Sequence, residues 1–114
     1  MWYNILLDMK ISSAVLDRIR ACLRDIAPDA RAILYGSQAR GDARPDSDVD
    51  ILILMPDTYQ GKEFVHKKFD ISDHLYDLSL ELGIDIAPLI TGNKAFYARK
   101  TPFTVNIENE GREI

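Results

Sequence analysis

An apolar strand that begins with two aspartates constrains the fold of this chain more than any other feature. Residues 48–55 read Asp-Val-Asp-Ile-Leu-Ile-Leu-Met and are followed by Pro-Asp, which predicts a strand that ends in a turn. A shorter apolar run, residues 32–35, precedes it and stops at Gly36, as suits a buried strand. The polar residues 37–47 between the two runs predict a loop with room for one helical turn. A sheet is therefore at the centre of the predicted fold.

An amphipathic helix is predicted before the first strand. Apolar residues recur at three- and four-residue steps over residues 15–26, which is the period of one helical face. Ser12 or Ser13 can cap the start of this helix, and Pro28 marks its end.

A second and longer helix is predicted after the Asp-x-Asp strand. Beyond Gly61, apolar residues again follow the helical period over residues 64–82, and Gly83 is placed to cap the end. Residues 84–90 then predict a third strand. The chain thus alternates between helical and extended patterns.

The last helix completes an order of elements that defines the fold class. Thr101 and Pro102 are typical of an N-cap followed by a first-turn proline, and Gly111 lies beyond the predicted end. The order helix, strand, strand, helix, strand, helix indicates an α/β (α+β) protein, with helices packed against a small mixed β-sheet. The 114 residues are expected to form a single domain over 1–114, with a core of about 10–114.

Composition excludes several classes of function. Fourteen Lys and Arg against eighteen Asp and Glu give a net charge of −4, so nucleic acid is a disfavoured partner. Cys22 is the one cysteine, and with two histidines it provides neither a disulfide nor a zinc site. The apolar start, residues 2–7, is too short and polar for a signal peptide or a membrane span. We therefore expect a cytoplasmic protein with no membrane partner, whose metal chemistry uses oxygen ligands.

The two aspartates at the start of the strand are candidate metal ligands. Asp48 and Asp50 are two residues apart, so on a strand both carboxylates project from the same face. A cation such as Mg²⁺ or Mn²⁺ relieves their repulsion. A third acid, Asp85, stands in the next predicted strand, where an unpaired buried charge is costly, and it can reach the same site if the strands are neighbours. The alternatives are a loop end and a solvated strand end for the pair, and a sheet edge for Asp85.

A glycine and a serine at the end of the first strand are candidate phosphate ligands. Gly36 allows close approach of a ligand, and Ser37 opens a polar turn whose backbone N–H groups and hydroxyl can face phosphate oxygens. No Gly-Lys-Ser/Thr follows, and Gly-x-Gly-x-x-Gly is missing, so the segment is neither a P-loop nor a dinucleotide fingerprint. Taken alone, the pair is an ordinary turn.

Together these segments resemble a known family. Gly36-Ser37, ten further residues and then Asp48-Val49-Asp50 are similar to the signature of nucleotidyltransferases of the DNA polymerase beta superfamily. The fuller run over residues 36–50 resembles the minimal nucleotidyltransferase (MNT) branch, and the resemblance extends over residues 10–114. It implies a nucleotidyltransferase fold and an enzyme that transfers a nucleotide with the help of metal ions.

The resemblance also implies a role for each candidate residue. Asp48 and Asp50 would hold Mg²⁺ or Mn²⁺, and Asp85 would join them as the third acid and help to activate the attacking hydroxyl. Gly36 and Ser37 would hold the terminal phosphates of a nucleoside triphosphate, with ATP as the expected substrate. Arg40 would be an additional phosphate contact.

For the MNT branch, the resemblance implies a protein acceptor. The expected partner is a HEPN-type toxin, which the chain silences as an antitoxin by binding it and transferring AMP to a tyrosine. One alternative is a non-catalytic binding module with the same fold, although such a module has no need of clustered carboxylates. Another is transfer to a small molecule such as an aminoglycoside, which the absence of room for a second domain disfavours.

Overall fold

A computed structural model describes residues 12–44 and 47–114. The apolar start at residues 2–7 and the proline-aspartate pair at 45–46 lie outside the described residues. Across the described ranges, no helix combines the length and the apolar character needed to cross a membrane.

Four strands form one mixed sheet in the order β3-β2-β1-β4, which confirms the expected α/β class. Strand β2 (Val49–Met55) lies antiparallel to β1 (Arg31–Tyr35) and parallel to β3 (Ile86–Gly92). The short β4 (Arg112–Glu113) pairs antiparallel with the other edge of β1. Strand β2 is paired along its whole length with β3 and over five residues with β1, whereas β4 pairs with only two residues of β1.

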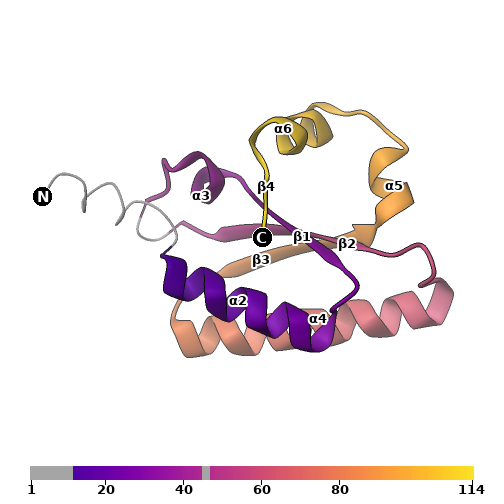
Figure 1. The fold of residues 1–114 in the computed structure, drawn as a ribbon, viewed down its shortest axis with the longest axis horizontal. Helices are drawn as coiled ribbons and strands as arrows, with labels where there is room; N and C mark the ends of the chain where they lie inside the picture. Colours follow the sequence, from indigo (N-terminus) through magenta and orange to yellow (C-terminus); the bar gives the residue numbers. More distant parts are fainter. Residues whose placement is uncertain (1–11, 45–46) are drawn as a thin grey trace, which may run out of the picture.

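Helices cover both faces of this sheet. Figure 1 shows α2 (Ser13–Ile26) and α4 (Gly61–Leu82) on one side, and α5 (Asn93–Tyr97) and α6 (Pro102–Glu110) on the other. Alternate side chains of β2 serve the two layers, as the period of a strand requires. On the α2 and α4 side the β2 core residues are Val49, Ile51, Ile53 and Met55, and on the other side Leu52 and Leu54 pack with Phe96 and Ile107.

The ends of the three longer helices confirm the capping pattern of the sequence. The Ser12 hydroxyl accepts a hydrogen bond from the Val15 N–H at the start of α2. Gly83 ends α4 in the left-handed conformation that glycine favours. Thr101 caps α6 in a capping box: its hydroxyl accepts a hydrogen bond from the Thr104 N–H, and the Thr104 hydroxyl accepts one from the Thr101 N–H.

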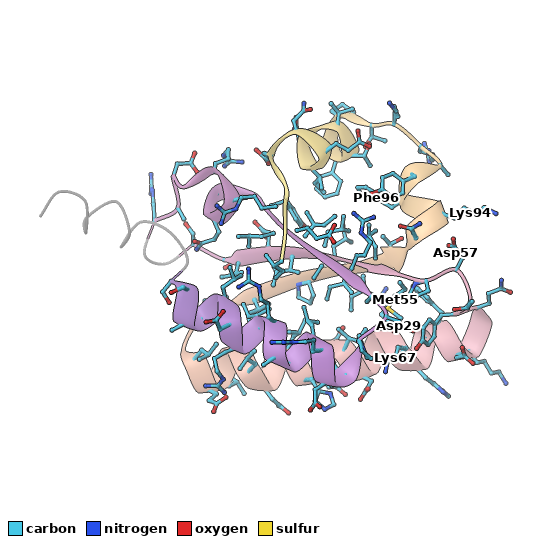
Figure 2. All side chains as sticks on the ribbon, in the orientation of Figure 1. Asp29, Met55, Asp57, Lys67, Lys94 and Phe96 are labelled. Atoms are coloured by element: carbon cyan, nitrogen blue, oxygen red, sulfur yellow. The ribbon has the colours of Figure 1, made fainter. Side chains whose placement is uncertain are left out.

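An aspartate joins the end of β2 to α5. One carboxylate oxygen of Asp57 accepts a hydrogen bond from the Lys94 N–H at 3.0 Å, and Figure 2 shows the two residues close together beyond the end of the strand. This bond helps to place α5, from which Phe96 reaches the sheet and is buried. Phe96 is therefore a core residue of the layer that covers this face of the sheet.

The structure corrects the bounds of the third strand, confirms the helical turn in the polar stretch and adds two short elements. The third strand runs over Ile86–Gly92 rather than 84–90, so Asp85 precedes it. The polar stretch contains a helical turn, α3 (Ser37–Arg40), at the place where the sequence left room for one. The elements α5 and β4 were not expected, because five and two residues are too short to show a period.

Candidate active site

The turn between β1 and α3 lies directly against a strand carboxylate. Gly36 follows β1 with a φ of +74° and precedes Ser37, the first residue of α3. A Cβ atom at this glycine would lie 2.6 Å from Oδ2 of Asp50, which is closer than atoms can pack. Glycine is therefore required here both by the positive φ and by the approach of the carboxylate. The two halves of the sequence motif meet at this point.

The carboxylate pair emerges on the α5 and α6 side of the sheet. Asp50 is paired with Tyr35 of β1 and Ala87 of β3, and it belongs to the opposite face from Val49. Asp48 precedes the first residue of β2 and is exposed, whereas Asp50 is half-buried. The predicted placement of both acids on one face agrees with this register.

The backbone of the third acid, Asp85, is hydrogen-bonded next to the carboxylate pair. The Asp85 carbonyl accepts a hydrogen bond of 2.8 Å from the N–H of Val49, the residue between the two aspartates. Continuing the parallel register by one residue places Asp85 opposite Asp48. The register therefore agrees with the prediction that Asp85 lies close to Asp48 and Asp50.

Asp85 does not occupy the buried strand position that the sequence predicts. The sequence suggested a charge buried inside a strand, but Asp85 is exposed and outside β3. Within residues 12–44 and 47–114, no three Asp, Glu, His or Cys side chains are gathered as a ready metal site. The preformed part of the site is the pair, because the Asp85 side chain is not held by burial.

Charge repulsion and burial both act on the inner carboxylate. The pKa of Asp50 is raised above the usual value, first by burial and then by the charge of Asp48, while the Arg40 guanidinium partly opposes this rise. The raised pKa means that negative charge is disfavoured at this position in the folded protein. A bound cation would remove that penalty.

Neutralising Asp50 is expected to leave the fold intact or to stabilise it slightly. Because its folded pKa is raised, Asp50 favours folding below its unfolded pKa, and this contribution is lost as the pH rises through the folded value. Asp50→Asn should therefore increase the free energy of unfolding near pH 7 by less than about 1 kcal/mol, since the group is partly solvated. Urea denaturation of both proteins at neutral and acidic pH measures the difference, which should shrink in acid. A loss of stability above about 2 kcal/mol at pH 7 would show a structural role instead.

A buried glutamine of α3 holds the segment that leads into Asp48. The sequence analysis did not single it out. Gln38 of α3 is 8% exposed, and its Nε2 donates a hydrogen bond to the Ser47 carbonyl at 3.4 Å. The bond ties α3 to the residue before Asp48. The one signal in the sequence was that Gln38 is a polar residue inside the motif for which the motif itself gives no role.

The arginine of α3 is already paired in this structure. Arg40 donates to Asp42 at 3.2 Å and to Glu110 of α6 at 3.2 Å. Its charge nevertheless acts on Asp50, so it lies near the candidate site. A role in phosphate binding would require Arg40 to exchange one of these partners for the ligand.

Aromatic side chains line the covered face next to the site. Tyr35 meets Phe103 of α6 edge to face, with ring centroids 5.7 Å apart. Burial and the nearby charge of Asp50 raise the pKa of the Tyr35 hydroxyl. Tyr97 and Phe103 are each 46% exposed. Tyr35 and Phe103 thus join the end of β1 to α6, whereas the Tyr97 hydroxyl of α5 accepts a hydrogen bond of 3.3 Å from the Arg31 guanidinium at the start of β1.

The residues present fit a divalent cation. Mg²⁺ is bound in proteins through one or two carboxylates, with substrate phosphates and water completing its shell. Asp48 and Asp50 supply such a pair, and burial and the charge of Asp48 raise the pKa of Asp50, so a cation between the carboxylates would be favourable there. The chemistry of the donor set thus suits metal-assisted transfer of a phosphate-linked group.

The fold, the glycine-serine turn and the carboxylate pair together define a nucleotidyltransferase. The chain belongs to the nucleotidyltransferase domain family, whose family model matches residues 16–111. This confirms the resemblance found in the sequence.

Two curated proteins are similar in sequence to this chain. The candidate protein adenylyltransferase MJ0141 of Methanocaldococcus jannaschii is 39% identical over 84 residues, which cover 74% of this chain and 77% of that protein. The terminal uridylyltransferase cid1 of Schizosaccharomyces pombe is 37% identical over 65 residues, or 51% of this chain. The match spans 16% of the uridylyltransferase, so the larger enzyme shares one segment with this chain.

A solved structure confirms the fold. The crystal structure of a toxin-antitoxin with AMP-PNP superposes with a TM-score of 0.59 and 19% sequence identity, covering 85% of this chain and 69% of that one. At this identity the likeness concerns the fold.

Proposed function

We propose that this nucleotidyltransferase transfers AMP from ATP to a hydroxyl group of a protein partner and acts as the antitoxin of a toxin-antitoxin pair. The observation that carries the proposal is the contact between Gly36 and Asp50. It puts a turn suited to phosphates and a carboxylate suited to a cation within one ligand's reach.

The relatives support the choice of nucleotide and acceptor. MJ0141, which resembles this chain over 77% of its own length, is named for protein adenylylation. The toxin-antitoxin of similar fold was crystallised with AMP-PNP, which makes ATP the first nucleotide to test. By the MNT resemblance, the acceptor we propose is a tyrosine of a HEPN-type toxin.

Each site residue receives a role in holding the substrate. Gly36 gives the triphosphate close access to the backbone, and the Ser37 hydroxyl and N–H donate to its terminal phosphate oxygens. Arg40 would leave Glu110 or Asp42 for a phosphate, since a nucleotide offers a second anionic partner. Asp48 and Asp50 would hold Mg²⁺ or Mn²⁺, which supplies charge neutralisation at the reacting phosphate.

The transfer itself breaks one bond and forms another. The acceptor oxygen attacks the α-phosphorus, the bond to the β-phosphate breaks, and pyrophosphate leaves with its electron pair. The proton of the acceptor hydroxyl needs a base, and the exposed Asp85 carboxylate beside Asp48 is the side chain we assign to it. Its exposure suits a group that must meet an incoming partner.

Asp85→Ala is expected to retain partner binding and to reduce the transfer rate by about 10²- to 10⁴-fold, the usual contribution of a general base. Rate measurements with the purified pair, alongside a pull-down, separate the two effects. Asp17→Ala, which removes an exposed acid of α2 on the other side of the sheet, is the matched control. Full activity of Asp85→Ala would refute the assigned role.

The experiment that tests the proposed function begins with the proteins that co-purify with this chain or are encoded beside it. They are incubated with the chain, Mg²⁺ and ATP labelled at either the α- or the γ-phosphate. We expect label from the α-position alone, located by mass spectrometry on a hydroxyl side chain of one protein. Absence of any labelled protein would favour the binding module, and label on a small molecule would favour the aminoglycoside-type alternative.

A further inference from the structure

Gln38 is the most deeply buried polar side chain of residues 12–44 and 47–114, and its amide is hydrogen-bonded at one end only. Its Nε2 donates to the Ser47 carbonyl at 3.4 Å, which is a long hydrogen bond. Its Oε1 is also buried and has no hydrogen-bond partner within the same ranges. Because an unsatisfied buried acceptor destabilises the folded state, an apolar side chain of this size would suit the core better. The stability of the fold therefore does not explain a glutamine at this position.

The hydrogen bond of Gln38 fixes a peptide group next to Asp48. The Ser47 carbonyl belongs to the peptide group on the N-terminal side of the Asp48 Cα atom. The peptide group on the other side is held as well, because the Val49 N–H donates to the Asp85 carbonyl at 2.8 Å. Since peptide groups are planar, two fixed planes determine the direction of the Cα–Cβ bond between them. Gln38 and Asp85 together therefore set the direction in which the Asp48 side chain leaves the backbone.

Asp48 depends on its backbone for orientation, because it is exposed and precedes β2, whereas Asp50 is half-buried within the strand. Packing does not restrain an exposed side chain. Ser47 is held within its own turn, since its N–H donates to the Arg44 carbonyl at 2.9 Å and its hydroxyl accepts from the Arg44 N–H at 2.8 Å. The bond from Gln38 attaches this turn to α3.

The same helical turn carries the proposed phosphate ligand. Ser37 precedes Gln38 in α3, and the Ser37 carbonyl accepts a hydrogen bond of 2.9 Å from the Gly41 N–H, which closes the turn. The two side chains therefore belong to one hydrogen-bonded unit. Through the bond between Gln38 and Ser47, the position of the phosphate-binding turn is coupled to that of the metal-binding Asp48.

We propose that Gln38 is a positioning residue for the cation, which orients the Asp48 carboxylate by holding the Ser47 carbonyl. The inference rests on the proposed metal-nucleotide site and adds the residue that keeps one ligand of that site in place. Removing a group that orients a metal ligand typically costs about 10- to 100-fold in metal affinity. Because Oε1 is unsatisfied, the role of Gln38 at the metal can be separated from its role in the fold: an apolar replacement should weaken metal binding without lowering stability.

Binding of Mn²⁺ in the presence of a non-hydrolysable ATP analogue tests the proposal without relying on transfer. The free Mn²⁺ concentration is measured by electron paramagnetic resonance on the purified chain. Gln38→Met keeps the length of the side chain and removes the donor, so it should weaken Mn²⁺ binding by at least about tenfold. Its affinity for the analogue without metal should be unchanged. Its melting temperature should equal or exceed that of the wild type, because the unsatisfied acceptor is gone.

Gln60 provides a matched control beyond the opposite end of β2. Its Nε2 also donates to a backbone carbonyl, that of Asp57, at 3.3 Å, so Gln60→Met removes the same kind of bond and should bind Mn²⁺ like the wild type. Equal Mn²⁺ affinity of Gln38→Met and the wild type would overturn the proposal. So would a joint loss of metal affinity and melting temperature in Gln38→Met, which is the result of a purely structural role. If the wild type itself bound no Mn²⁺ with the analogue, the proposed metal site would fail and this inference with it.

Discussion

Gly36→Ala is expected to abolish measurable nucleotidyl transfer while leaving most of the protein folded. The new Cβ would lie 2.6 Å from Asp50 Oδ2, so the carboxylate or the turn must move. A displacement of about 1 Å in a catalytic group can cost about 10²-fold in rate. The positive φ of +74° adds a backbone cost of about 1 to 2 kcal/mol for any residue with a side chain.

Gly83→Ala separates the two effects. Gly83 has a similar φ of +66°, and a Cβ added there would meet nothing within 4 Å. It should therefore share the backbone cost and keep the full transfer rate. Melting temperatures and labelling rates of the two variants, measured side by side, check this expectation. If Gly36→Ala lost no more activity than Gly83→Ala, the contact with Asp50 would have no role in the site.

Asp48→Asn and Asp50→Asn are each expected to lower the transfer rate by about 10³-fold or more. An amide keeps the size of the side chain but removes the charge that a divalent cation requires. Both variants should remain folded, because neutralising either carboxylate relieves the repulsion between the two. Loss of transfer with an intact fold would therefore show that the charges of these two carboxylates act in the transfer reaction.

A matched acid on the same side of the sheet provides the control for these two variants. Glu108 lies in α6 and is exposed, so Glu108→Gln removes one charge without touching the site. It should transfer nucleotide at the wild-type rate. Substantial activity in either aspartate variant, or an equal loss in Glu108→Gln, would contradict the assignment of Asp48 and Asp50.

The sequence predicted most of the elements that position the site, for physical reasons that are visible in particular residues. The capping residues Ser12, Gly83 and Thr101 mark helix ends by local hydrogen bonding and backbone preference, which operate over a few residues. Strand β2 could be recognised because a short, continuous run of apolar residues bounded by turn residues is typical of a buried strand. Local rules of this kind need no knowledge of the tertiary fold.

What the sequence could not supply depends on contacts between distant residues. The approach of Gly36 to Asp50 follows from the antiparallel register of β1 and β2, and no local pattern encodes it. The sequence predicts a buried Asp85, but the residue is exposed, because its burial depends on where β3 begins to pair with β2. The role of Gln38 also depends on a tertiary contact, because its hydrogen-bond acceptor is a carbonyl nine residues away.

Calorimetric titration with a non-hydrolysable ATP analogue tests the central claim most directly, namely that the glycine-serine turn and the carboxylate pair form one metal-nucleotide site. The titration compares the wild type with the Asp48→Asn, Asp50→Asn double variant, each with and without Mg²⁺. We predict that Mg²⁺ tightens binding of the analogue to the wild type by at least about tenfold and has no such effect on the double variant. Equal Mg²⁺-dependent binding by the two proteins would contradict the account.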